Sequence, residues 1–162
     1  MMFARQHGGW IIVLSFIVAL IFTALKLPEW ARIWRPGWVA LVLVYWCMAV
    51  PHRVGVAIGL CLGLALDVMN GTLLGQHALA LSLVAFITHQ LHRRVRVLPL
   101  WQQGVSVFML MLIYQGPILW IAGMQGALVE MKALWTMPLT SMLLWPWVFV
   151  VLRDMRRKYL VT

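Results

Sequence analysis

The chain has 162 residues, of which 64% are hydrophobic and only 10% are charged, and its mean hydropathy is +0.91. Soluble domains carry about 25% charged residues, so this composition excludes an ordinary soluble protein and indicates an integral membrane protein. The net charge of +9 comes from basic residues that lie between apolar segments, so we expect a lipid bilayer around the chain and no nucleic-acid partner.

Apolar segments along the chain predict an all-α integral membrane protein with six transmembrane helices in a single transmembrane domain, residues 1–162. The expected spans are about 9–25, 36–50, 52–69, 74–91, 100–122 and 135–152. No small-x-small cleavage site follows the first apolar segment before Lys26, so we expect it to be a retained span rather than a signal peptide.

The last two spans contain prolines, which interrupt helices. The uncharged run 97–129 is longer than one ordinary span, and a kink or end is expected near Gly116-Pro117. A short interfacial segment carrying Glu130 and Lys132 is expected to follow. Two further prolines in the sixth span predict a kink there as well, at Pro138 and Pro146.

The distribution of Lys and Arg predicts the orientation. With the N-terminus inside, nine basic residues fall in cytoplasmic segments and four in external loops, which accounts for all 13. The opposite orientation would place the larger share outside. We therefore expect both termini to be cytoplasmic.

The longest hydrophilic stretch, KLPEWARIWRPGW at residues 26–38, is expected to be external. It carries Trp30, Trp34 and Trp38 at intervals of four, with arginines between them. Aromatic residues with interleaved arginines are typical of the membrane interface. A docking surface for a periplasmic partner is the alternative interpretation.

Small residues recur every fourth position through GVAIGLCLGLALDVMNGTLLG at residues 55–75. The series is Gly55, Gly59, Gly63, Asp67, Gly71 and Gly75. Glycines four apart share one helix face and allow a second helix to approach closely. We expect tight packing within the monomer, while a subunit interface and a glycine-lined path stay open as alternatives.

Asp67 interrupts the glycine series with a carboxylate at membrane depth, where a charge is costly to bury. We expect it to accept hydrogen bonds from backbone amides at the start of the fourth span. In that structural role, Asp67→Asn should keep near-normal function. A proton- or substrate-binding carboxylate is the alternative.

No catalytic constellation is recognisable in the sequence, which lacks G-x-S-x-G, H-E-x-x-H, a P-loop and paired carboxylates. His89 and His92 form H-x-x-H, but no Cys, Asp or Glu lies nearby to complete a metal site. We expect no enzyme activity, no cofactor and no metal.

Three sequence blocks resemble the MreD family of the bacterial cell-elongation machinery: RPGWVALVLVYWCMAVPHRVGVAIGLCLGLALDVMNGTLLG at 35–75, LWQQ at 100–103 and LWPWVF at 144–149, followed by a short basic tail. The chain departs from the family pattern at Gly37, where relatives often have an acidic or amide residue, and at Gln115, which offers no second membrane carboxylate. The positions that match the family block are Arg35, Pro36, Trp38, Tyr45, Trp46, Pro51, Gly63, Asp67, Gly71 and Gly75.

The resemblance implies a non-enzymatic scaffold of the elongasome in the bacterial inner membrane that binds MreC and supports rod shape and peptidoglycan synthesis. MreB, RodA and a class B penicillin-binding transpeptidase would belong to the wider complex. The expected partner or packing interface comprises Gly55, Gly59, Gly63, Asp67, Trp30, Trp34, Arg35, Pro36 and Trp38.

The same resemblance implies a fold similar to the S component of energy-coupling-factor transporters. This makes a membrane binding module for a lipid-linked or vitamin-like small ligand the alternative function. A ligand-sized pocket with convergent polar groups around Asp67 would favour that alternative, whereas a packed interior would favour the scaffold.

Overall fold

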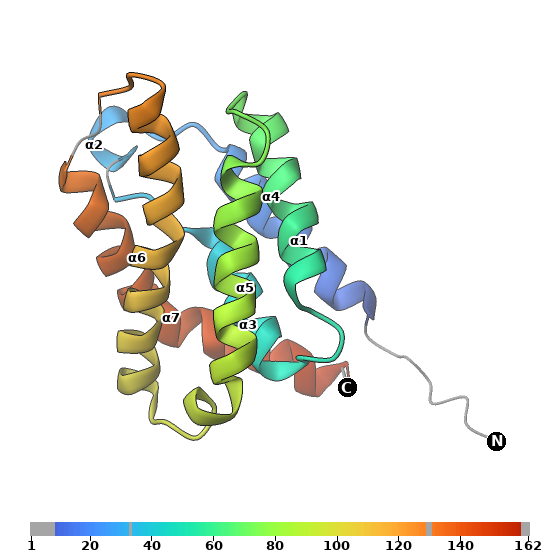
Figure 1. The fold of residues 1–162 in the computed structure, drawn as a ribbon. Helices are drawn as coiled ribbons and strands as arrows, with labels where there is room; N and C mark the ends of the chain where they lie inside the picture. Colours follow the sequence, from blue (N-terminus) through green and yellow to red (C-terminus); the bar gives the residue numbers. More distant parts are fainter. Residues whose placement is uncertain (1–8, 33, 129–130, 160–162) are drawn as a thin grey trace.

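The computed structural model describes residues 9–32, 34–128 and 131–159, and the secondary structure elements within these ranges are all helices. The predicted all-α class is therefore confirmed. Each of the six predicted ranges overlaps one helix, and the short helix α2 lies between the first two ranges (Figure 1). The helices are α1 (Gly9–Ala24), α2 (Glu29–Arg32), α3 (Trp38–Ala49), α4 (Val56–Asn70), α5 (Gln76–Val95), α6 (Leu100–Met124) and α7 (Met131–Lys158).

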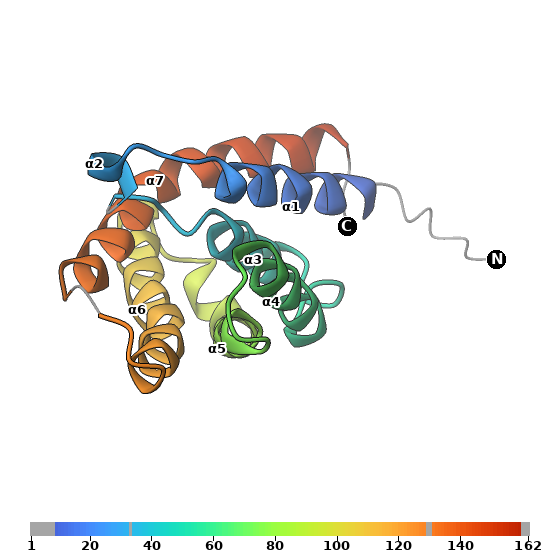
Figure 2. The ribbon, with the colours of Figure 1, turned by 90° about the horizontal axis from the view of Figure 1, so that it is seen from above.

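Helix α3 forms the centre of the bundle. All ten residues from Val39 to Met48 are buried, so this helix is apolar and enclosed on every face. It contacts α1 and α7 on one side and α5 and α6 on the other, an arrangement that Figure 2 shows from above. Helix α4 lies at the periphery and packs mainly against α5.

The outer surface of the bundle is apolar. Helices α1, α4 and α5 each expose large aliphatic or aromatic side chains at intervals of three or four residues, including Val13, Ile17, Ile21, Leu60, Leu64, Val68, Leu79, Leu83 and Phe86. Such a surface is unfavourable in water but suits a hydrocarbon environment. Two helices of the described part, Leu100–Met124 and Leu134–Lys158, are long and apolar enough to cross a membrane. These features are those of a membrane protein, and the crossing of all six helices stays a prediction.

The region around the prolines differs from the expectation in one respect. Helix α6 does not end at Gly116-Pro117 but continues to Met124, and α7 already begins at Met131. Lys132 therefore belongs to α7 rather than to a separate interfacial segment, and Glu130 lies outside the described residues. A proline inside a buried membrane helix is tolerated because neighbouring helices and local adjustments satisfy the freed backbone groups.

Helix α7 changes direction along its length. Figure 1 shows its first part beside α6 and its last part running across the lower end of the bundle toward the C-terminus. The helix contains Pro138 and Pro146, each of which removes a backbone hydrogen bond and clashes with the preceding turn. The predicted bend in the last helix is therefore present.

Candidate functional site: a braced carboxylate and an adjoining cavity

Helices α4 and α5 approach each other closely at two glycines of α4. A Cβ built on Gly59 would lie 2.9 Å from the Leu81 carbonyl oxygen, and one on Gly63 would lie 2.2 Å from the Ala78 Cα. Both neighbours are backbone atoms of α5, which have little freedom to move. Glycine at these two positions is therefore required for α4 and α5 to pack backbone to backbone.

Gly55, expected on the same packing face, does not take part in this contact, and neither do Gly71 and Gly75, which follow the end of the helix. A Cβ on Gly55, Gly71 or Gly75 would meet no atom within 4 Å. Helix α4 ends at Asn70, and Gly71 (φ +66°) and Gly75 (φ +103°) adopt left-handed conformations in the turn before α5. The interval of four residues thus continues past the end of α4 because the turn requires left-handed conformations, and not because these glycines pack against α5.

Asp67 lies one turn after Gly63 and is 1% exposed. Its Oδ2 accepts hydrogen bonds from the backbone N–H groups of Gly75 (2.9 Å) and Ala78 (3.4 Å). Its Oδ1 accepts from the Thr72 hydroxyl and the His77 backbone N–H, both at 2.9 Å, and lies 2.8 Å from His77 Nδ1.

This arrangement makes Asp67 the cap of a neighbouring helix. The side chain of an N-cap residue normally accepts hydrogen bonds from the second and third helical N–H groups, but the N-cap of α5 is Gly75, which has no side chain. Asp67 supplies the missing acceptor from α4, and its charge complements the positive end of the α5 dipole. The hydrogen bonds expected between Asp67 and the start of the fourth span are therefore present.

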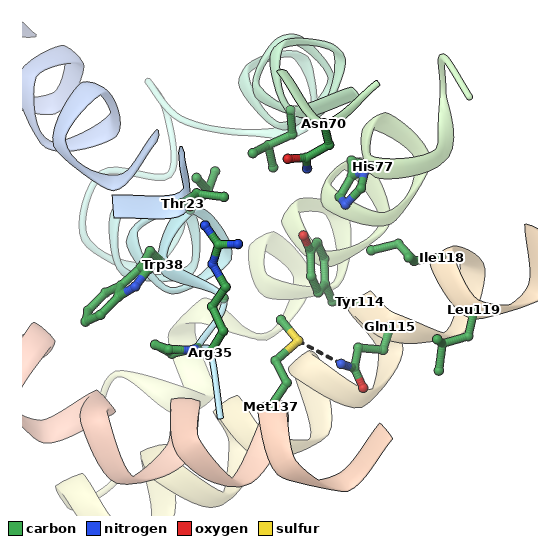
Figure 3. A pocket seen from close by; sticks show the side chains of 14 residues that line it. Thr23, Arg35, Trp38, Asn70, His77, Tyr114, Gln115, Ile118, Leu119 and Met137 are labelled. Carbon is green, nitrogen blue, oxygen red and sulfur yellow. Dashed lines mark hydrogen bonds between the residues drawn. The ribbon is translucent and has the colours of Figure 1, made fainter. Parts of the chain in front are cut away.

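A cavity of about 270 Å³ adjoins this cap at the end of the bundle where α2 and the α4–α5 turn lie. His77 lines it on one side and so connects it to Asp67, which does not line it itself. Figure 3 shows Arg35, Asn70, His77 and Tyr114 pointing toward the common space from different segments of the chain.

Several polar groups of this cavity are already engaged within the chain. Arg35 Nη2 donates to the Leu25 carbonyl oxygen (3.2 Å), and Gln115 Nε2 donates to Met137 Sδ (2.8 Å). Ligand pockets of drug-sized molecules have volumes of about 300–1,000 Å³, so this cavity of about 270 Å³ is slightly smaller than that range. It can hold a few water molecules or a small polar group.

The predicted external aromatic residues have two different environments. Trp30, in α2, is 77% exposed and Trp34 is 52% exposed. Trp38 is instead half-buried at the start of α3, with its ring 5.3 Å from that of Phe22, and with Arg35 and Pro36 it lines the cavity. The three tryptophans therefore do not form one continuous exposed belt, because the chain turns inward before Trp38.

One polar contact joins two blocks that the sequence alone left separate. Trp145 Nε1 donates to Gln103 Oε1 (3.3 Å), and Gln103 Nε2 donates to the carbonyl oxygens of Val95 and Leu98, both at 3.2 Å. The Gln103 side chain thus caps the C-terminal end of α5. It also links the block LWQQ at 100–103 to the block LWPWVF at 144–149. A glutamine in an otherwise apolar helix was the available signal, but its partner Trp145 is distant in sequence.

The fold and the braced carboxylate define an all-helical membrane protein in which α4 and α5 pack backbone to backbone. The chain belongs to the family of rod shape-determining protein MreD, which matches residues 4–155. It is 34% identical over 151 residues to the rod shape-determining protein MreD of Haemophilus influenzae, across 92% of this chain and 93% of that protein. No solved structure matches the chain.

Proposed function

We propose that the protein is a non-enzymatic scaffold of the elongasome in the bacterial inner membrane, where it binds MreC and supports rod shape and peptidoglycan synthesis. The observation that carries the proposal is the family match over nearly the whole chain. The wider complex would include MreB, RodA and a class B penicillin-binding transpeptidase. The proposal does not require any of these three to contact this protein directly.

The geometry of the described helices supports this role. Gly59, Gly63 and Asp67 are all occupied by contacts with α5, so they stabilise the bundle and leave its outer faces for a partner. Trp30 and Trp34 project at the end of the bundle where the periplasmic part of MreC would lie. A rigid bundle with exposed aromatic residues suits a lasting membrane partner, because helix association in lipid depends on close packing and few polar contacts.

The proposed topology has six membrane crossings, both termini in the cytoplasm and a helix arrangement similar to that of the S components. Figure 1 supports the alternating direction of the helices: the α4–α5 connection and the end of α6 lie at one end of the bundle, and the α3–α4 and α5–α6 connections lie at the other. Reporter fusions at residue 162 and at Arg96, just after the end of α5, should report a cytoplasmic location, and fusions beside Glu29 and Glu130 should report a periplasmic location. A periplasmic C-terminus would contradict the six-span topology.

The second candidate function is a membrane binding module for a lipid-linked or vitamin-like ligand. The cavity lined by Arg35, His77 and Tyr114 favours it, since polar groups from several segments converge there. Its volume of about 270 Å³ fits only part of such a ligand unless the bundle opens. Saturable binding that is lost in Arg35→Gln, with the fold intact, would support this candidate.

The proposed function is tested in rod-shaped cells that depend on the protein. Depletion should produce round cells, and the full chain supplied in trans should restore rods. A variant that still folds and inserts but cannot retain MreC should fail to restore them. Depleted cells that stay rod-shaped would contradict the proposal.

A further inference from the structure

A second cavity, of about 300 Å³, lies at the opposite end of the bundle from the Asp67 cap. Four arginines line it: Arg96 follows the end of α5, and Arg153, Arg156 and Arg157 lie near the end of α7. Two segments that are distant in the chain therefore place four positive charges around one space. We refer to the cavity that these four arginines line as the arginine cavity.

The arginine cavity also contains a buried hydroxyl group. Tyr45 in α3 is 2% exposed and lines the cavity, and its ring packs at 5.2 Å against Trp46 and at 5.7 Å against Phe149. Within the described part of the chain, the Tyr45 hydroxyl has no hydrogen-bond partner. A fixed, buried hydroxyl of this kind indicates a missing acceptor or donor in the cavity.

The charges in this cavity are poorly balanced by the chain. The only ion pair of the four arginines among the described residues joins Arg153 Nε to Asp154 Oδ1 at 3.6 Å, and the Asp154 side chain is 65% exposed. Gln103 also lines the cavity, but its amide is already engaged with Val95, Leu98 and Trp145. The four positive charges that line the arginine cavity would therefore favour an anion in this space.

We propose that the arginine cavity binds a phosphate-bearing anion, with the headgroup of an acidic phospholipid as the expected source. Guanidinium groups match phosphate oxygens in paired hydrogen bonds, and the Tyr45 hydroxyl can donate one more. Basic pockets between membrane helices on the cytoplasmic side bind such headgroups. The cytoplasmic placement of the cavity rests on the proposed topology.

The test uses the full-length protein in detergent, with phosphatidylglycerol and phosphatidylcholine as probes and bound lipid counted by native mass spectrometry. Phosphatidylglycerol should bind preferentially. The double variant Arg156→Gln/Arg157→Gln should weaken that binding by about tenfold or more, as expected for the loss of charge-assisted hydrogen bonds. Tyr45→Phe should weaken it by a smaller factor while leaving all charges in place.

The matched control is Arg93→Gln/Arg94→Gln, which removes two exposed charges from the last turn of α5 outside the cavity. It should weaken binding by less than about threefold. Competition by inorganic phosphate would identify a soluble anion as the source, and its failure to compete would identify the lipid.

Equal loss in the two double variants, or equal binding of the two lipids, would overturn the proposal. Binding of an acidic polypeptide but of neither phosphate probe would also overturn it. If the Arg156→Gln/Arg157→Gln variant loses lipid binding but still retains MreC, the loss concerns the arginine cavity and not the proposed scaffold function.

Discussion

Gly63→Ala should strongly destabilise the protein, although the change adds a single methyl group. The new Cβ would lie 2.2 Å from Ala78 Cα and 2.4 Å from Ala78 N, so α4 and α5 would have to separate. Overpacking of this kind typically costs about 1–3 kcal/mol, and backbone neighbours place the cost at the upper end. We expect a clearly lower thermal unfolding midpoint in detergent.

The separation of the helices has a second consequence. Asp67 lies one turn beyond Gly63, and it reaches the first N–H groups of α5 only because the backbones are so close. The clash and the loss of the cap should therefore occur together. The matched control is Gly123→Ala, in α6, where a Cβ meets no atom within 4 Å and the higher helix propensity of alanine should stabilise slightly. Equal tolerance of the two substitutions would contradict the tight contact.

Asp67→Leu should have an equally large effect. It would leave the backbone N–H groups of Gly75 and His77 without their acceptor in a buried site. Each unpaired buried group costs about 1–3 kcal/mol, so a loss of about 2–6 kcal/mol is expected. The variant should accumulate poorly in membranes and unfold at a lower temperature than the parent.

The structure revises the expectation for Asp67→Asn. Both carboxylate oxygens of Asp67 accept hydrogen bonds, so the amide NH₂ of asparagine would face an N–H donor whichever way it is turned. Asparagine should therefore be intermediate rather than near-normal, with the larger defect remaining in the leucine variant. If asparagine destabilised the protein as much as leucine, the charge itself would be the essential feature of this site.

The sequence predicted well those features that depend on local pattern. Apolar runs indicated the six long helices, and the spacing of Gly59, Gly63 and Asp67 indicated one buried face of α4. The same interval continues at Gly71, which lies between the third and fourth predicted spans, and at Gly75, because a positive φ in a turn and close packing in a helix both favour glycine. Sequence spacing alone does not distinguish these two requirements.

Features that depend on distant segments could not be predicted. Nothing in the apolar pattern showed that α5 would be the neighbour of the glycine face. The two cavities also join distant residues, since Arg35 meets His77 and Tyr114 in one, and Arg96 meets Arg153 in the other. Such sites arise from the packing of whole helices, which the local pattern of any one helix does not specify.

Co-purification with MreC in mild detergent tests the proposed scaffold most directly. The two proteins should be recovered together in a fixed ratio, and Trp30→Ala/Trp34→Ala should reduce the recovery of MreC. Trp101→Ala, which removes a 69% exposed tryptophan from the start of α6 at the opposite end of the bundle, should leave recovery unchanged. Purified protein that retained no MreC but bound a small ligand saturably would contradict the scaffold and support the binding module.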